Sequence, residues 1–560
     1  MNKLSLGFKI AKSLSKFCLD EFRRSTLFAN LPGLPKLQIA EEMSWGELVA
    51  EKAARYGDRT FLNFDDQTLS YADMNDRANQ LANFLKRQGG GRGAGVAMLM
   101  ANSPRFLDVF FGLQKIGMYA VPINTSLKGD SLRYVLKHCD AKMVVMDEAF
   151  ADEYFKAAGD LKRIEGIIIN GMPPRGISDS RLVSLDSAYD EPKVEPGIGH
   201  DPDDICLIMY TSGTTGRSKG VVYRYRKSSV KLLSLVANLL YDKNDVLYTC
   251  MPLFHGNALF VTTTCAMHVG ARVALSKKFS ASRFFEEIRQ SGATTFNTIG
   301  AMIPILMKQP ERPEDSQNSV KFIISAACPV DLWEAFEKRF GFKIYETYGA
   351  VDGGGKTILN LGTGPVGSIG KPPMKLKYRL VDSEMLDVPV GTPGELIFAA
   401  SKSKKGGVEY YKDEKASGKK QKSGWILTGD LMKRDKKGYL YFTGRNTESM
   451  RIKGENVSAF EVENTLHKHP AVLEVAVFAV PSDLAEDDIM ACASLVEGKS
   501  VTESDLVAFA RKNLPKFAVP RYVKIVEEFS KTVTQRIKKK ELENKGIVAG
   551  TYDAAKDAFA

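Results

Sequence analysis

The sequence predicts an α/β protein with a large N-terminal region and a small C-terminal one. Apolar strands of the buried type alternate with amphipathic helices from residue 44 to about residue 340, which is typical of parallel sheets. Residues 375–443 change to short strands between glycine turns, which indicates a small antiparallel sheet or barrel. A chain of 560 residues is too long for one compact core, so we expect several domains.

The parallel part falls into two stretches, each expected to form one α/β subdomain. In the first, helices are predicted at 45–56, 71–87, 104–117 and 127–138, and strands at 95–100, 118–123 and 142–146. A low-complexity segment at 191–204 is interpreted as the connection between the subdomains. In the second, strands are predicted at 205–209, 246–250, 272–275, 293–296 and 321–324, and helices at 282–291 and 330–340.

The remaining chain predicts the antiparallel unit and a small α+β domain. The antiparallel strands are expected at 378–381, 395–398, 424–427 and 438–442. The lysine- and glycine-rich stretch 401–422 predicts a mobile surface loop. The small domain is expected to contain helices at 459–469 and 503–514 and strands at 474–480 and 522–526. The predicted domains are an arm at 1–28, a large domain at 29–445 and a mobile small domain at 446–560.

Composition limits the class of partner. Lys and Arg outnumber Asp and Glu by 78 to 67, which favours polyphosphates, phosphorylated coenzymes or anionic membranes. The chain shows no basic and aromatic module of the nucleic-acid-binding kind, so we expect no nucleic-acid partner. Seven cysteines without a CxxC pair predict buried thiols in a reducing, cytoplasmic compartment. No apolar run has the roughly 18 residues of a membrane span.

Residues 1–28 alternate apolar side chains with lysines and arginines. Two interpretations remain open: a basic amphipathic helix in peripheral contact with an anionic membrane, or an ordinary helix packed on the large domain.

The stretch Tyr210–Gly220 is the strongest functional signal. A buried strand runs directly into Ser, Thr and Gly residues followed by Lys219. Small residues let a phosphate chain approach the backbone, N–H groups and hydroxyls donate to its oxygens, and the lysine adds positive charge. A polar surface turn is the alternative. The stretch is not a Walker loop, because no helix is expected to start at the lysine.

Further polar clusters lie where predicted strands end, at 252–255, 325–329, 345–352, 428–430, 444–445 and 451–456. With Tyr210–Gly220, they resemble the motifs of the adenylate-forming superfamily, which contains acyl-CoA synthetases, firefly luciferase and peptide-synthetase adenylation domains. The resemblance extends from about residue 40 to residue 545. Residues 102–124, 124–129 and 453–457 are most similar to the fatty-acid transport protein and very-long-chain acyl-CoA synthetase branch, and 453–458 also to carnitine/crotonobetaine-CoA ligases.

The resemblance implies two half-reactions with ATP, Mg²⁺ and CoA as cofactors and a small carboxylic acid as substrate. The carboxylate attacks the α-phosphate of ATP to give acyl-AMP and pyrophosphate, and the CoA thiol then displaces AMP. Tyr348 would stack on adenine, Asp430 would bind the ribose hydroxyls with Arg445 nearby, and Lys219 would neutralise the pyrophosphate. The other implied nucleotide-site residues are Thr211, Ser212, Gly213, Thr214, Thr215, Gly216, Ala327, Thr347, Gly349 and Gly454. The implied metal ligands are Thr215 and Asp352.

The resemblance also implies a moving small domain. His255 would line the carboxylate entry, with a merely packed histidine as the alternative. The small domain would swing about 446–448, first presenting Arg536 and then bringing Arg451, Lys453 and Gly454 to the thioester site. The acyl pocket would lie at 298–301 and along the helix that follows to Met307. Gly300 would leave room for a medium or long acyl chain; the alternative is a glycine that packs at a helix start.

The chain departs from the family pattern at three places. Val351–Asp352 replaces Thr-Glu, Arg536 replaces the catalytic lysine, and Ala326–Ala327 stands where many relatives have glycines. Arg keeps the charge of Lys but not its compact shape, and Lys538 is a candidate substitute. Slower adenylation, another substrate or lost activity are the possible consequences.

Three rival functions remain. Residues 350–357 match a Walker loop except for Ala350, so a P-loop NTPase is one rival hypothesis. The departures raise a catalytically weakened acyl-binding or transport protein on the same fold. A third hypothesis is an enzyme that stops at acyl-AMP and passes the acyl group to a carrier protein. The oligomeric state is not predicted.

Overall fold

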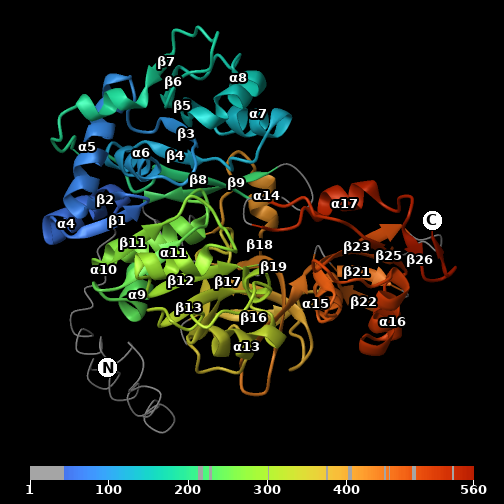
Figure 1. Ribbon diagram of the computed structural model, residues 1–560. Coiled ribbons are helices and arrows are strands. Elements are labelled where there is room, and N and C mark those ends of the chain that lie inside the picture. The colour runs from blue at the N-terminus through green and yellow to red at the C-terminus, as the bar shows by residue number, and fades with distance from the viewer. Residues whose placement is uncertain are drawn as a thin grey trace.

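The computed structural model describes residues 43–197, 199–211, 218–225, 230–299, 302–373, 376–400, 407–446, 449–452, 455–481, 487–532 and 535–559. Among these residues, three sheets form the large N-terminal part, and two smaller sheets belong to the small C-terminal domain, which lies to one side of it (Figure 1). The predicted arm at 1–28 lies outside the described residues.

The first sheet has seven strands in the order β7-β6-β5-β3-β4-β8-β9. All neighbouring strands are parallel except β8 and β9. The strands are β3 (Gly95–Leu99), β4 (Tyr119–Pro122), β5 (Ala141–Asp147), β6 (Gly166–Asn170), β7 (Leu182–Ser184), β8 (Ile205–Thr211) and β9 (Lys219–Arg224). Helices α7 (Gly129–His138) and α8 (Ala151–Ala158) pack on one face, and α5 (Tyr71–Arg87) and α6 (Pro104–Lys115) on the other.

The second sheet has eight strands in the order β15-β14-β13-β12-β10-β11-β1-β2, with antiparallel strands at both edges of a parallel centre. Its strands are β1 (Thr60–Phe64), β2 (Gln67–Ser70), β10 (Val246–Thr249), β11 (Arg272–Leu275), β12 (Thr295–Ile299), β13 (Phe322–Ala326), β14 (Lys343–Gly349) and β15 (Thr357–Asn360). Its helices are α9 (Val230–Leu240), the π-helix η5 (Asn257–Thr264), α10 (Cys265–Val269), α11 (Phe284–Ser291), α12 (Met302–Met307) and α13 (Val330–Phe340).

One continuous apolar core joins the two sheets. Trp45, the first residue of α4 (Trp45–Tyr56), is fully buried and stacks on Phe260 of η5 with ring centroids 5.6 Å apart. Its indole N–H also donates to Thr264 Oγ1. Local sequence sets where these helices begin, because Ser44 and Ser70 each form a capping box at a helix N-terminus. The two α/β units therefore bury a shared interior, which fixes their relative position.

The third sheet is antiparallel and small. It pairs β16 (Tyr378–Val381), β17 (Gly394–Ala399), β19 (Trp425–Arg434) and β18 (Gln421–Lys422) in that order, with β20 (Leu440–Arg445) on β19. Of the two alternatives predicted for this region, the pairing of the described residues gives an open sheet.

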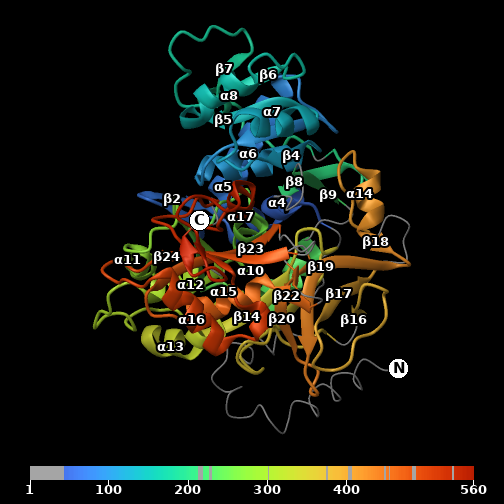
Figure 2. The same ribbon diagram turned by 90° about the vertical axis from the view of Figure 1, so that its right-hand side faces the viewer.

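The described part of the small domain contains a two-stranded sheet, a five-stranded sheet and three α-helices. Its elements are β21 (Ser449–Ile452), β22 (Glu455–Ser458), α15 (Ala459–His467), β23 (Val472–Pro481), β24 (Asp487–Leu495), α16 (Glu503–Asn513), β25 (Tyr522–Ile525), α17 (Lys539–Lys545), β26 (Tyr552–Asp553) and β27 (Ala558–Phe559). Figure 2 shows this domain in front of the large one. Lys308, which directly follows α12, donates to the carbonyl oxygens of Val472 and Leu473 at 2.8 and 2.6 Å and so ties the two domains together.

Most predicted elements occur within a few residues of their expected limits, but two predictions were wrong. Residues 401–422 are not one loop: helix α14 (Glu414–Lys419) and strand β18 lie in this stretch, and Asp413 caps the helix by accepting from the Ala416 N–H. Residues 191–204 do not join two subdomains. They return from β7 to β8 within one sheet, held by α5 side chains such as Gln80, which donates to the Glu191 carbonyl.

Candidate active site

Strands β8 and β9 frame the predicted phosphate-binding loop. Thr211 is the last residue of β8 and pairs with Lys219, the first residue of β9. The Thr211 hydroxyl donates to the Lys219 carbonyl oxygen at 3.4 Å. Ser212, Gly213, Thr214, Thr215 and Gly216 lie outside the described residues, so their roles stay predictions. The pairing of β8 with β9 nevertheless places both ends of the loop at one edge of the sheet.

Asp430 lies at the centre of a first carboxylate cluster, formed with Tyr348 and Arg445. The Tyr348 hydroxyl donates to Asp430 Oδ2 at 2.6 Å, and Arg445 Nε lies 3.1 Å from Oδ1. Asp430 and Arg445 face each other across the antiparallel pair β19–β20, and Asp430 is only 4% exposed. Burial, and then the neighbouring Asp430 carboxylate, raise the pKa of Tyr348. Three residues predicted for the adenosine end of the site therefore lie together.

Asp352 lies at the centre of a second carboxylate cluster, formed with Tyr410, Lys420 and Lys219. The Tyr410 hydroxyl donates to Asp352 Oδ2 at 2.6 Å, and Lys420 Nζ lies 2.9 Å from the same oxygen. Lys219 Nζ lies 5.3 Å from the centroid of the Tyr410 ring. Burial alone would raise the pKa of Asp352, but Lys420 and the Tyr410 hydroxyl together hold it below the ordinary value.

The segment that carries Tyr410 lies beside strand β9. The Tyr411 N–H donates to the Gly220 carbonyl at 2.7 Å, and the Val222 N–H donates to the Glu409 carbonyl at 2.9 Å. These backbone bonds fix Tyr410 next to Lys219. Tyr410, from the segment before α14, therefore lies at the C-terminal end of the predicted phosphate loop.

Ala327 and Glu346 form the support of the predicted adenine loop. Ala327 has a left-handed backbone with φ +68°, a conformation that favours glycine. Its N–H and that of Cys328 both point to the carboxylate of Glu346, which is 3% exposed. Burial raises the pKa of Glu346 to about 7, although these donors act in the opposite direction. Thr347 and Gly349 continue the same strand, where Gly349 pairs with Thr357.

His255 and Arg536 interact electrostatically across the domain boundary. His255 follows a turn in which its N–H donates to the Pro252 carbonyl at 3.0 Å. Burial, and then the positive charge of Arg536, lower the pKa of His255 to about 4, so the imidazole is neutral at pH 7. Arg536 itself belongs to the small domain, where its N–H donates to Thr532 Oγ1 at 3.1 Å. The charge of Arg536 therefore acts on a residue of the large domain. Lys538, the candidate substitute, pairs with Glu541 at 3.2 Å.

Several predicted site residues are not placed. Lys453, Gly454, Gly300 and most of the predicted hinge lie outside the described residues. The backbone of Arg451 pairs with Asn456 in the β21–β22 hairpin, but its side chain is not described. The roles assigned to them stay predictions.

The predicted magnesium ligands are Thr215 and Asp352, and only Asp352 can be tested against the structure. Its Oδ2 atom already accepts from Tyr410 and pairs with the ammonium of Lys420. Among the described residues, no group of three or more His, Cys, Asp or Glu side chains is placed to hold a metal ion. This arrangement does not fit a divalent cation on Asp352, since the ammonium and the metal would repel each other at one oxygen.

The Walker-like stretch 350–357 lacks the context of a nucleotide-binding P-loop. A turn at 351–355 leads into strand β15, which pairs antiparallel with β14. A Walker loop requires a helix at this point. The P-loop hypothesis therefore has no structural support.

Sequence reasoning missed three residues of these clusters: Glu346, Tyr410 and Lys420. A signal for Glu346 existed, because Ile344, Glu346 and Tyr348 alternate along β14 and share its buried face. Tyr410 and Lys420 fall in the stretch predicted as a loop, and no local pattern distinguishes Lys420 from the lysines around it.

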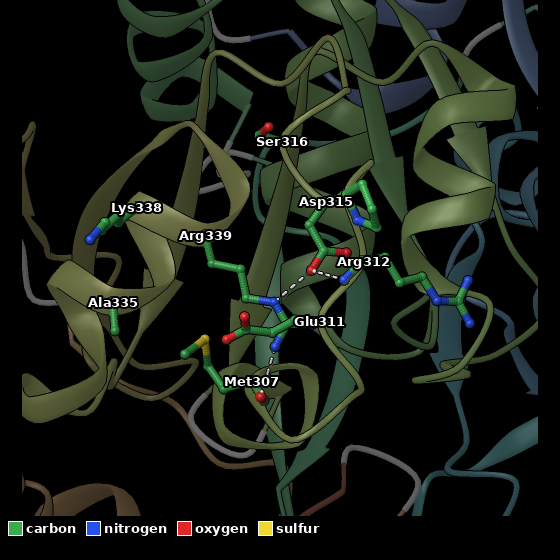
Figure 3. A pocket seen from close by; sticks show the side chains of 9 residues that line it. Met307, Glu311, Arg312, Asp315, Ser316, Ala335, Lys338 and Arg339 are labelled. Carbon is green, nitrogen blue, oxygen red and sulfur yellow. Dashed lines mark hydrogen bonds and ion pairs between the residues drawn. The ribbon is translucent and has the colours of Figure 1, made fainter.

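A surface pocket of about 400 Å³ lies apart from these clusters, beside α12 and α13 (Figure 3). Arg339 in its wall is neutralised by Asp315 at 2.7 Å and donates to the Met307 and Gln309 carbonyls. This guanidinium ties the segment after α12 to α13. Of the predicted site residues, Met307, at the end of the helix expected beside the acyl pocket, lines it.

Comparison with known proteins gives the family of the chain. The AMP-binding enzyme family matches residues 49–406, and the AMP-binding enzyme C-terminal domain matches residues 461–536. Steroid-22-oyl-CoA synthetase of Rhodococcus jostii (strain RHA1) is 31% identical, over 90% of this chain and 87% of that protein. Medium/long-chain-fatty-acid–CoA ligase FadD17 of Mycobacterium marinum is also 31% identical, over 89% and 95%.

Two further similar proteins are also CoA ligases. Crotonobetaine/carnitine–CoA ligase of Proteus mirabilis is 30% identical over 89% of this chain and 98% of that protein. The crystal structure of the anthranilate CoA ligase AuaEII in complex with anthranoyl-AMP has a TM-score of 0.80 and 26% identity, over 90% of this chain and 97% of that one.

The chain belongs to the AMP-binding enzyme family, within the adenylate-forming superfamily. It is an acid–thiol ligase, an acyl-CoA synthetase whose substrates include ATP and CoA. Among the residues that the structure describes, no helix is both long and apolar enough to cross a bilayer.

Proposed function

We propose that the chain activates a medium- to long-chain fatty acid as an acyl-AMP and transfers the acyl group to CoA. The proposal rests on one observation: Lys420 connects the Asp352 cluster to the Asp430 cluster. Lys420 Nζ contacts Asp352 and also donates to the carbonyl of Thr428, two residues before Asp430. The predicted phosphate-binding residues and the predicted ribose-binding aspartate therefore lie close together.

The residues suit the first half-reaction. A carboxylate oxygen of the acid attacks the α-phosphorus of ATP, and the bond to the bridging oxygen breaks to release pyrophosphate. Lys219 and residues 211–216 would stabilise the charge on the departing group. Neutral His255 would line the acid's entry, and Arg536 would add positive charge near the α-phosphate. Tyr348, Asp430 and Arg445 would hold the nucleoside, and Mg²⁺ would arrive as the counterion of ATP.

The second half-reaction uses the small domain. The CoA thiolate attacks the acyl carbonyl, the C–O bond to AMP breaks, and the thioester forms. Arg451, Lys453 and Gly454 would reach this site after rotation about 446–448. The limits 29–445 and 446–560 are proposed for the two domains, with support from family matches at 49–406 and 461–536.

The acyl group is the least constrained part of the proposal. The FadD17 relative supports a fatty acid, and the crotonobetaine/carnitine relative supports a second candidate with a charged head group. The departures at Val351, Asp352 and Arg536 favour a third candidate, a weakened acyl-binding or transport protein.

One panel assay separates these candidates. AMP release is measured with fatty acids of increasing length, carnitine, crotonobetaine and aryl acids, each with and without CoA. We expect the highest rate with a medium or long fatty acid and only when CoA is present. AMP release with carnitine or crotonobetaine but with no fatty acid would select the second candidate. If a separate measurement finds no exchange of pyrophosphate into ATP with any acid, the third candidate is selected.

We propose a cytoplasmic location, supported by six buried free cysteines among the described residues. Peripheral membrane contact through 1–28 is part of the proposal. Vesicle co-sedimentation of the full chain and of a chain that starts at residue 29 tests it, and equal binding by both would contradict it.

A further inference from the structure

One oxygen of Asp352 is occupied by the protein's own cation. Lys420 Nζ lies 2.9 Å from Oδ2, and their side chains are only 16% and 23% exposed. The Tyr410 hydroxyl donates to the same oxygen at 2.6 Å. A divalent cation that used this oxygen would have to displace the ammonium or remain beside it, and close like charges in a shielded site repel strongly.

The position of Lys420 is fixed by the backbone. Its carbonyl accepts from the Leu427 N–H at 2.9 Å, which attaches the end of α14 to strand β19. Its ammonium donates to the Thr428 carbonyl at 3.2 Å, and the Thr428 hydroxyl accepts from the Asp430 N–H at 3.1 Å. Lys420 therefore links the carboxylate of Asp352 to the strand that carries Asp430.

We propose that Lys420 is a positioning residue of the nucleotide site, which holds Asp352 as an ion pair in place of a protein-bound divalent metal. The metal then reaches the site only as part of MgATP. This inference rests on the proposed function for its substrate. Lys219, above the ring of Tyr410, supplies a second ammonium at the same edge. Two lysines thus provide the fixed positive charge close to Asp352.

The first test is a Mn²⁺ titration of the nucleotide-free full-length protein, followed by the electron paramagnetic resonance signal of free Mn²⁺. We expect no binding that depends on Asp352 in the natural chain. Lys420→Met should add weak Mn²⁺ binding that depends on Asp352, because the competing ammonium is gone but only one carboxylate is freed. The double variant Lys420→Met/Asp352→Asn should lose it. Lys419→Met, which removes an exposed neighbouring lysine, is the matched control.

Two outcomes would overturn the proposal. One is Mn²⁺ binding by the natural chain that Asp352→Asn abolishes. The other is a folded Lys420→Met variant, with the same melting temperature as Lys419→Met, that gains no Mn²⁺ site.

The second test measures pyrophosphate exchange. Lys420→Met should raise the KM for MgATP roughly tenfold, because a charged contact is lost, and Lys420→Arg should restore part of it. An unchanged KM contradicts the role. If the natural chain shows no exchange with any acid, the proposed function fails, whereas the Mn²⁺ titration still decides the role of Lys420.

Discussion

Asp430 and Asp352 are held by the same kinds of partner in two different settings. Each accepts a tyrosine hydroxyl at 2.6 Å and pairs with a cation, Arg445 for Asp430 and Lys420 for Asp352. The Asp430 cluster stands on three regular strands, β14, β19 and β20. In the Asp352 cluster, by contrast, Asp352 lies in a turn and Lys420 follows a helix of six residues.

The difference separates two tasks. A nucleoside has a fixed shape, and a site carried by strand backbone can be matched to it in advance. Pyrophosphate must leave the site, so the groups that neutralise its charge must also be able to release it. Arg445 presents a planar fork to one carboxylate, whereas Lys420 is a compact point charge. We infer that the Asp430 cluster contributes mainly to binding and the Asp352 cluster to the change in charge during reaction.

The largest expected effect comes from removing each carboxylate. Asp430→Ala should lower the rate of pyrophosphate exchange by roughly 100-fold or more, because Arg445 loses its partner and the ribose its acceptor. Asp352→Ala should lower it by roughly tenfold, as the loss is confined to a partly exposed ion pair. Asp66→Ala, at an exposed turn, is the control. An equal loss in both variants would break the comparison.

Behind the Asp430 cluster, Glu346 should make stability depend on pH. Its pKa rises from 4.5 to about 7 on folding, so the native state holds the proton more tightly, and stability should fall as pH rises through this window. The loss amounts to about 3 kcal/mol. Glu346→Gln should remove it, as measured by urea unfolding at pH 4 and pH 8. Glu334→Gln, on the exposed face of α13, should leave it unchanged.

A smaller effect is expected from the two tyrosine hydroxyls. Tyr348→Phe should weaken nucleotide binding by roughly tenfold, since Asp430 is almost fully buried and loses a charged hydrogen bond. Tyr410→Phe should cost roughly threefold, because water can replace the hydroxyl at the more exposed Asp352. Calorimetric titration with a nonhydrolysable ATP analogue measures both. The reverse order would place the main binding energy at the Asp352 cluster.

The smallest effect concerns strain in the adenine loop. Ala327→Gly should stabilise the protein by about 1 kcal/mol, because an alanine with positive φ carries a steric cost that glycine does not. A thermal melt detects this as a higher melting temperature. Ala326→Gly, at the neighbouring residue in strand β13, should give no such gain.

Much of the fold followed from local pattern. The helices at 45–56, 71–87 and 330–340 were predicted with the limits that the structure has, because capping residues and apolar periodicity are local properties. Segment 401–422 was mispredicted because its lysine-rich composition outweighed the local cap signal at Asp413, and because the packing of Ala416 is a tertiary contact.

The sequence by itself determined the class of site, because the motifs that carry Lys219, Tyr348 and Asp430 resemble those of adenylate-forming enzymes. Only the tertiary structure decided which lysine pairs with Asp352. Five lysines lie between residues 412 and 422, and composition makes them equivalent. The attachment of α14 to β19 places Lys420, and no other described lysine of that stretch, against the carboxylate, because backbone pairing between distant segments sets the position of a side chain.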